Sequence, residues 1–198
     1  MKTSHSIAII GGGPTGLMFG CLCALRGWDF VLLDKRVSHS THSRSIGIHP
    51  PSLRLFEQIG LRPALLDQGT RIETGVAHIE RERCGTIDFT RIAHGPPYIL
   101  TLAQSITESL LEKRLRELAP DSLVRGQAVK EMVKNNNRYH LKTERGVTIS
   151  VDWVVLTAGV MALGLLFVNI VKTGQDEIGS SLGGSLSSSA TTIPEIDF

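Results

Sequence analysis

Apolar and polar positions near the amino end predict a strand, a helix and a second strand. Residues 7–10 (IAII) form a short apolar run of the kind found in a buried parallel strand. Residues 15–26 predict a helix, and Gly27 stands where a helix commonly ends. Residues 29–34 (DFVLLD) predict the next strand. Together these segments indicate one βαβ unit.

The middle of the chain predicts a second helix followed by short β segments. Residues 49–61 contain two consecutive prolines, which favour a helix start, and then become periodic. Between residues 69 and 102 the chain changes to short β-like pieces separated by glycine and proline.

A longer helix is predicted over residues 105–118. Ser105 and Glu108 have the spacing of a capping box, in which two side chains bond to the backbone of the first turn. The core face of this helix would be made by leucines, namely Leu110, Leu111, Leu115 and Leu118. The chain beyond it predicts a β-meander that ends in a buried strand at residues 153–157.

The last part of the chain departs from this pattern. Residues 153–171 are 19 residues without a charge. Residues 173–198 are rich in Ser, Gly and Thr, and they cannot bury enough apolar surface to offset their ordering entropy. We therefore expect a nucleotide-binding type of domain over 1–158 with 69–102 as the start of a second lobe, a divergent apolar segment at 159–172, and a disordered tail beyond it.

Composition and charge narrow the function classes. The chain has 198 residues, a formal net charge of +2 and 5% aromatic residues, so neither nucleic acid nor an anionic membrane surface is an expected partner. Three cysteines, without zinc spacing, predict buried thiols in the cytoplasm and no metal site. The uncharged run at 153–171 is barely long enough to cross a bilayer, so membrane association stays an alternative to a cytoplasmic location.

The glycines that follow the first predicted strand match G-x-G-x-x-G. Gly11 permits a tight turn out of the strand, and Gly13, without a Cβ, lets the backbone approach a pyrophosphate. Gly16 allows the helix to pack closely on the sheet. The free N–H groups and positive dipole end of the helix would then face the phosphates. The motif predicts dinucleotide binding, with a purely structural glycine turn as the alternative.

The end of the second predicted strand carries an acidic residue, Asp34, 18 residues after Gly16. A carboxylate at this place can accept hydrogen bonds from the ribose hydroxyls of the adenosine half. It also disfavours a 2′-phosphate, so NADP fits this site poorly. NAD and FAD both remain open, because the βαβ unit alone does not separate them.

Several segments resemble the FAD-dependent aromatic-ring monooxygenases, the para-hydroxybenzoate hydroxylase-like flavoproteins, in order and approximate spacing over residues 5–158. These segments are "IAIIGGGPTGL", "VLLDKR", "SRSIGIHPPSLRLFEQIGL", "GTIDF" and "YILTLAQSITESLLEKRL". The resemblance implies an α/β, Rossmann-like FAD/NAD(P)-binding fold with an incomplete β-rich substrate lobe. The chain looks like the N-terminal part of that family, and we expect it to be truncated.

The resemblance also implies site residues. The three motif glycines would hold the FAD pyrophosphate with the backbone of Thr15 beside it, and Asp34 would bind the adenosine ribose. Arg44 matches an arginine that contacts the FAD phosphate and ribityl region, and Gln104 matches a glutamine on the flavin side. Val129 falls where a backbone group meets adenine.

Members of the family reduce FAD with NAD(P)H and use O₂ to hydroxylate an electron-rich substrate, often a phenol. For this chain the resemblance implies a small aromatic or polyketide-like substrate, with secondary metabolism as the expected setting. This chain departs from the family pattern late, where Ala158-Gly159 stands in place of an Asp-Gly motif. No catalytic residue is identified. We therefore keep two hypotheses: an FAD-dependent monooxygenase, with a separate C-terminal partner chain as one way to complete it, and a truncated, non-catalytic flavin-binding remnant or interaction module.

Overall fold

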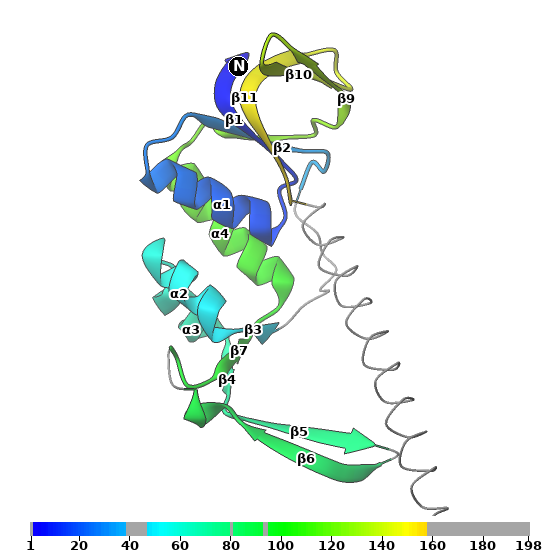
Figure 1. The fold of residues 1–198 in the computed structure, drawn as a ribbon. Helices are drawn as coiled ribbons and strands as arrows, with labels where there is room; N and C mark the ends of the chain where they lie inside the picture. The colour runs from blue at the N-terminus through cyan, green and yellow to red at the C-terminus, as the bar shows by residue number, and fades with distance from the viewer. Residues whose placement is uncertain (1, 39–46, 80, 93–94, 158–198) are drawn as a thin grey trace, which may run out of the picture. The chain divides into compact units, whose positions relative to one another are not determined.

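A six-stranded sheet forms the centre of the computed structural model, which describes residues 2–38, 47–79, 81–92 and 95–157. Its strand order is β8-β2-β1-β11-β10-β9 (Figure 1). The strands are β1 (Ser4–Ile10), β2 (Phe30–Asp34), β8 (Leu123–Arg125), β9 (Val129–Asn135), β10 (Arg138–Thr143) and β11 (Thr148–Leu156). β8, β2, β1 and β11 run parallel, whereas β9, β10 and β11 form an antiparallel meander. This confirms the α/β class and the predicted meander.

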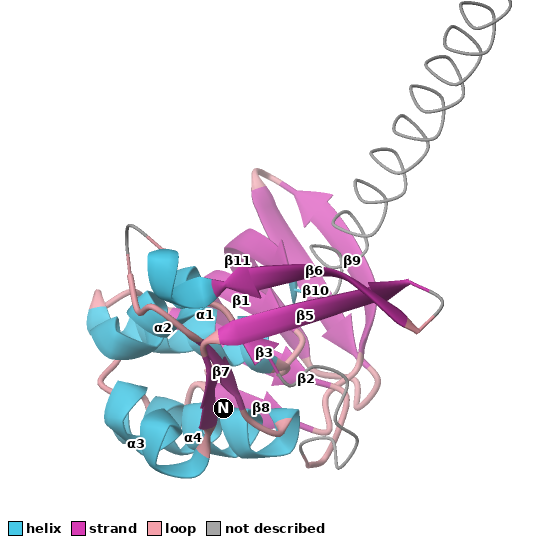
Figure 2. Cartoon of the chain, turned by 90° about the horizontal axis from the view of Figure 1, so that it is seen from below, coloured by secondary structure: helices cyan, strands magenta, loops and turns pink. Residues whose placement is uncertain are grey.

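The helices of the described residues lie on the same side of the sheet, with α1 (Pro14–Leu25) and α4 (Gln104–Leu118) next to it and α2 (Pro50–Gln58) and α3 (Arg62–Gln68) farther away (Figure 1; seen from below in Figure 2). α1 and α4 lie side by side, with Cys21 Sγ 3.7 Å from the Leu111 carbonyl oxygen. α2 and α3 follow β2 in the chain. α1 ends as predicted, because Gly27 just beyond it adopts φ +67°, a left-handed conformation that suits glycine.

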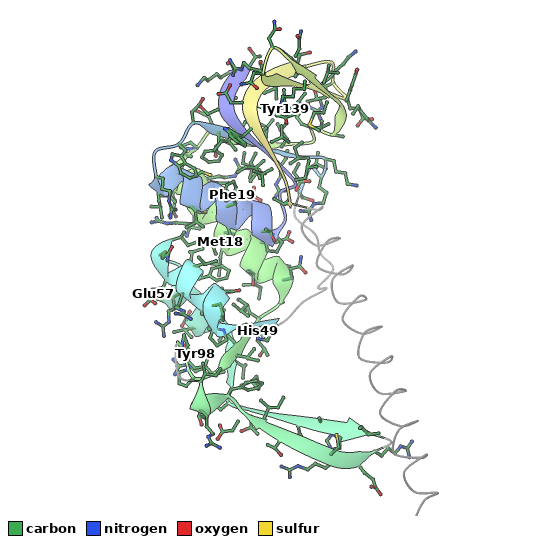
Figure 3. The ribbon with its side chains drawn as sticks, viewed as in Figure 1. Met18, Phe19, His49, Glu57, Tyr98 and Tyr139 are labelled. Atoms are coloured by element: carbon green, nitrogen blue, oxygen red, sulfur yellow. The ribbon has the colours of Figure 1, made fainter. Side chains whose placement is uncertain are left out.

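Short strands form two smaller sheets. β3 (Gly47–Ile48), β7 (Ile99–Thr101) and β4 (Thr70–Ile72) form a three-stranded sheet in the order β3-β7-β4. β5 (Thr74–Ile79) and β6 (Glu82–Asp88) form a separate antiparallel hairpin. Tyr98, which directly precedes β7, is buried (Figure 3). The Arg71 guanidinium of β4 lies 5.1 Å from its ring centroid.

The core occupies both faces of the central strands, which explains why they read as continuous apolar runs. Ile9 and Leu32 are fully buried in a cluster that includes side chains of α1 and α4. Their neighbours Ala8, Val31 and Leu33 are buried in a second cluster on the other face, with side chains of β10 and β11. Successive strand residues point to opposite faces, so a strand buried on both sides needs apolar residues at every position.

The capping box predicted at the start of α4 is wrong. The helix begins at Gln104 with Ala103 as its N-cap, and no side chain caps it. Ser105 therefore lies inside the first turn, and Glu108 is buried at 1% exposure for a different reason, described below. The predicted core face is correct in its centre, since Leu111 and Leu115 are fully buried while the other two leucines are partly buried.

The last strand exists, but the prediction that residues 153–157 are buried throughout is wrong. Trp153 is 72% exposed and Leu156 is 48% exposed. The reason lies in the sheet register, because β10 pairs with β11 only from Thr148 to Val151. Beyond that point, within the described residues, β11 has β1 as its neighbour on one side, and its side chains lose cover on the other.

Several sequence predictions concern residues outside the described ranges. The apolar segment at 159–172 and the tail at 173–198 fall there, and so does most of the uncharged run at 153–171. Its first residues belong to β11. Among the described residues no helix has the length and apolar character needed to cross a membrane.

Candidate dinucleotide-binding site

The glycine turn after β1 depends on the absence of side chains at two places. Gly11 adopts φ +111°, a conformation that L side chains rarely adopt, and its N–H donates to the Leu33 carbonyl at 2.8 Å. A Cβ on Gly16 would lie 1.9 Å from the Gly11 carbonyl oxygen. The first turn of α1 therefore packs directly on the end of β1, as predicted for the third glycine of the motif.

Gly13 is different, because nothing in the described structure requires it to be glycine. Its φ of −79° is ordinary, and an added Cβ would meet no described atom within 4 Å. It stands at the N-cap of α1, where the first N–H groups of a helix lack intrahelical partners. Thr15 is exposed in the same turn. An open backbone beside free N–H groups and a positive helix end fits a diphosphate group.

The carboxylate of Asp34 lies against this turn and is only 3% exposed. The Gly12 N–H donates to its Oδ2 at 3.1 Å. A Cβ on Gly12 would lie 2.5 Å from the same oxygen, so this position also needs glycine. The motif leaves it unspecified, and sequence reasoning assigned it no role.

Two arginines that the sequence interpretation did not select surround Asp34. The backbone N–H and the guanidinium NH2 of Arg36 both donate to the carboxylate at 3.0 Å. Arg125 NH1 donates to Oδ2, also at 3.0 Å. The hydrogen bond to Asp34 is the main cause that raises the pKa of Arg36 above its ordinary value. Asp34 is therefore the centre of a buried ion network.

The network extends to α4 through Glu112. Arg125 Nε donates to Glu112 Oε2 at 3.1 Å, and Arg116 NH2 donates to Oε1 at 2.8 Å. Burial alone would raise the pKa of Glu112, but the hydrogen bonds from these arginines hold the pKa below its ordinary value. This carboxylate is therefore kept ionised by its partners.

A second branch of the network reaches Gln104, the residue assigned to the flavin side. Its Nε2 donates to Glu108 Oε1 at 2.8 Å, and Arg36 NH1 lies 3.5 Å from Glu108 Oε2. Arg36 NH2 also donates to the Gly12 carbonyl at 3.0 Å. Gln104 and Asp34, far apart in the sequence, thus belong to one set of connected side chains.

The segment after β8 lies beside the end of β2, close to where adenine was predicted. The Gly126 N–H donates to the Arg36 carbonyl at 3.0 Å, and the Gln127 N–H donates to the Asp34 carbonyl at 2.9 Å. Val129 begins β9 two residues later. Among the described residues Gln127 Oε1 is buried without a hydrogen-bond partner.

The far end of β11 holds the turn from the opposite side. Thr157 is buried, and its hydroxyl lies 2.9 Å from the Ile10 carbonyl oxygen and 3.0 Å from that of Gly11. A hydroxyl can donate to either oxygen, which ties the end of β1 to the end of β11. No sequence motif selected this residue.

The structure thus brings most of the predicted site residues to one edge of the sheet. The glycine turn, Thr15 and Asp34 meet at the carboxyl ends of β1 and β2, and Gln104 joins them through Glu108 and Arg36. Arg44 lies outside the described residues. Arg36 could have been suspected from its place two residues after Asp34, whereas nothing in the sequence pairs Arg125 with a residue 91 positions away.

The chain also matches a known protein family. The sequence profile of the FAD binding domain family matches residues 4–162. The chain belongs to this FAD binding domain family. The choice between NAD and FAD, which the βαβ unit left open, is thereby decided in favour of FAD. The open Gly13 backbone is compatible with that cofactor.

Curated relatives of this FAD binding domain are monooxygenases, which confirms the sequence resemblance. An uncharacterized aromatic compound monooxygenase of Bacillus subtilis is 32% identical over 121 residues, 61% of this chain and 24% of the relative. Rifampicin monooxygenase of Rhodococcus hoagii is 29% identical over 151 residues, 75% of this chain and 30% of the relative. The chain thus spans less than a third of the length of these two relatives.

Solved structures show the same fold. p-Nitrophenol 4-monooxygenase of Pseudomonas putida superposes with a TM-score of 0.71 at 22% identity, covering 79% of this chain and 41% of that one. The anhydrotetracycline hydroxylase of Streptomyces rimosus gives a TM-score of 0.68 at 24% identity, covering 77% and 31%. The Rossmann-like fold predicted from the glycine motif is confirmed.

Proposed function

We propose that this FAD binding domain serves an FAD-dependent monooxygenase that hydroxylates a small aromatic or polyketide-like molecule with NAD(P)H and O₂. The observation that carries the proposal is the open Gly13 backbone at the start of α1, next to the buried Asp34 carboxylate. This pairing offers one place for a diphosphate, at the turn, and one for a ribose, at the end of β2 beside it.

In this proposal the residues of the turn bind the cofactor and do not react. The first N–H groups of α1, near Thr15, would bind the diphosphate, and Gly13 would admit it to the backbone. Asp34 would accept from the ribose hydroxyls, with Val129 near adenine and Gln104 on the flavin side. Arg44 keeps its assigned role at the phosphate and ribityl region as a sequence-based prediction.

The cofactor supplies the redox chemistry, and the protein supplies orientation and electrostatics. Asp34 is held by Gly12 and two arginines, so its oxygens are fixed before a ligand arrives. Preorganised acceptors lose less entropy on binding than mobile ones. The substrate class rests on the names of relatives that act on rifampicin and anhydrotetracycline, and it is a proposal for this chain.

A titration with FAD tests the proposal at its base. We expect the protein to quench flavin fluorescence and to retain FAD through gel filtration, with FMN, which lacks the adenosine half, binding more weakly. A protein that associates with no FAD even at millimolar concentration would contradict the proposal.

One observation favours a second candidate, a flavin-binding module without activity of its own. Every residue of β6 is exposed, and most of β5 is exposed with it. Within the described residues this part of the substrate lobe therefore provides no enclosed wall around a substrate. Family enzymes need such an enclosure, since water competes for reactive species in an open site.

Activity measurements separate the two candidates. The FAD-loaded chain is supplied with NADH or NADPH, O₂ and a panel of phenols, and hydroxylated product is measured by mass spectrometry. Product formation above that of free FAD supports the monooxygenase. The flavin-binding module is supported if the chain retains FAD but forms no hydroxylated product. In that case NADH or NADPH is either not oxidised or oxidised with hydrogen peroxide as the only product. A separate C-terminal partner chain and a cytoplasmic location remain predictions.

A further inference from the structure

Glu108 of α4 is a buried acidic side chain that caps no helix. Its exposed fraction is 1%, and burying a carboxylate is costly unless cations and donors surround it. Gln104 Nε2 donates to one of its oxygens at 2.8 Å, and Arg36 NH1 lies 3.5 Å from the other. One carboxylate therefore joins the first turn of α4 to the segment that follows β2.

Arg36 continues this connection to the glycine turn. Its NH2 donates to Asp34 Oδ2 and to the Gly12 carbonyl, each at 3.0 Å. Asp34 in turn accepts from the Gly12 N–H. A chain of direct contacts thus runs from Gln104 through Glu108, Arg36 and Asp34 to the turn.

We propose that Glu108 is a positioning residue of the dinucleotide site, which fixes Gln104 at the flavin end and, through Arg36, Asp34 at the adenosine end. This inference rests on the proposed function for the two ends. A carboxylate oxygen accepts hydrogen bonds, so the Gln104 side chain presents its NH₂ group to Glu108. The same carboxylate holds the Arg36 guanidinium between α4 and Asp34.

The test uses the full chain and two ligands, because ADP reaches only the adenosine end whereas FAD reaches both. The variants are Glu108→Gln, Arg36→Met and the double variant, with Glu117→Gln as the matched control on the exposed side of α4. We expect Glu108→Gln to weaken FAD binding by about tenfold and ADP binding by about threefold or more. The control should bind both ligands like the unaltered protein.

The double variant tests whether Glu108 and Arg36 act through the same contacts. Glu108 acts on Asp34 through Arg36. The double variant should therefore bind ADP no more weakly than whichever single variant has the lower ADP affinity. Additive losses would overturn the proposal. A Glu108→Gln protein that binds both ligands normally, or that loses FAD affinity alone, would also overturn it.

Two other failures can be distinguished from a failure of the proposal: a variant that does not fold, and an unaltered protein that binds neither ligand. If Glu108→Gln alone does not fold, the double variant carries the test, since removing both members of a buried ion pair is often tolerated. A folded double variant that binds FAD and ADP like the unaltered protein contradicts the proposal. If the unaltered protein binds neither ligand, the proposed function fails first.

Discussion

At the scale of single residues, three adjacent glycines differ in what their positions require. Gly11 needs a left-handed backbone, and Gly12 leaves room for the Asp34 carboxylate. Gly13 has an ordinary conformation and open space around it among the described atoms. Folding therefore accounts for the first two glycines, and ligand binding is the reason we propose for the third.

This difference predicts opposite behaviour for two alanine substitutions. Gly13→Ala should change the unfolding free energy of the ligand-free protein by about 1 kcal/mol or less, because its Cβ meets nothing. It should nevertheless weaken FAD binding strongly. Gly16→Ala should prevent stable folding, since its Cβ would lie 1.9 Å from a carbonyl oxygen. Urea unfolding and FAD titration measure both effects, and a stable Gly16→Ala protein would refute the packing argument.

Glu112 predicts a pH dependence of stability. Burial raises the pKa of Glu112, but hydrogen bonds from Arg125 and Arg116 lower it by more. The pKa in the folded state is therefore below its ordinary value. A lowered pKa contributes stability above the unfolded-state pKa, and this contribution is lost as the pH falls through the folded-state pKa. Glu112→Gln should thus cost about 2 kcal/mol near pH 7, and the difference from the unaltered protein should shrink near pH 4.

Urea unfolding at several pH values measures this contribution. Glu117→Gln is the control, because the Glu117 side chain is 49% exposed and its ion pair with Arg114 is open to solvent. The control should run parallel to the unaltered protein at every pH. A Glu112→Gln protein that also ran parallel would show that the buried contacts add no acid-sensitive stability.

At the scale of elements, α1 and the β5–β6 hairpin differ in what they bury. α1 packs against the sheet and against α4, and its Cys21 and Cys23 are fully buried. The hairpin pairs its two strands with each other only, within the described residues, and Cys84 on β6 is exposed. A two-stranded hairpin alone is marginally stable, so we expect it to open more readily than α1.

Thiol labelling reports this difference. Burial raises the pKa of Cys21 to about 12, which the nearby Arg114 lowers only in part, and burial also raises the pKa of Cys23. Since the thiolate is the reactive form, a disulfide reagent at about pH 8 should label Cys84 quickly in the native protein. The two helix thiols should react only on unfolding. Rapid labelling of all three thiols in the native protein would contradict the burial of α1.

At the scale of the whole molecule, Asp34 links parts of the chain that are far apart in sequence. Its carboxylate contacts both the turn after β1 and Arg125 at the end of β8, which lies 91 residues after Asp34. Removing one member of a buried ion network leaves its partners uncompensated. Asp34 therefore has a structural role besides the ribose contact that the sequence suggested.

This role predicts a loss of stability without any ligand. Asp34→Asn should lower the unfolding free energy of the ligand-free protein by about 3 kcal/mol, because Arg36 and Arg125 lose their shared carboxylate. Asp121→Asn, at an exposed position, should change it little. Urea unfolding measures both variants. An Asp34→Asn protein as stable as the unaltered one would show that Asp34 serves the ligand alone.

The sequence by itself determined the βαβ unit, the glycine turn and the place of Asp34, because these depend on local periodicity and on the steric freedom of glycine. The motif also placed Gly16 at a close contact, which the geometry bears out. The β-meander was predictable for the same local reason.

Only the tertiary structure decided which charges meet and which strand ends stay covered. Arg125, Glu108 and Thr157 join the site through contacts between elements remote in sequence, and no local pattern encodes such pairs. The capping box at Ser105 and the buried end of β11 were wrong for this reason. Local spacing predicts an element and its apolar face, whereas burial at one residue depends on the neighbour that packs against it.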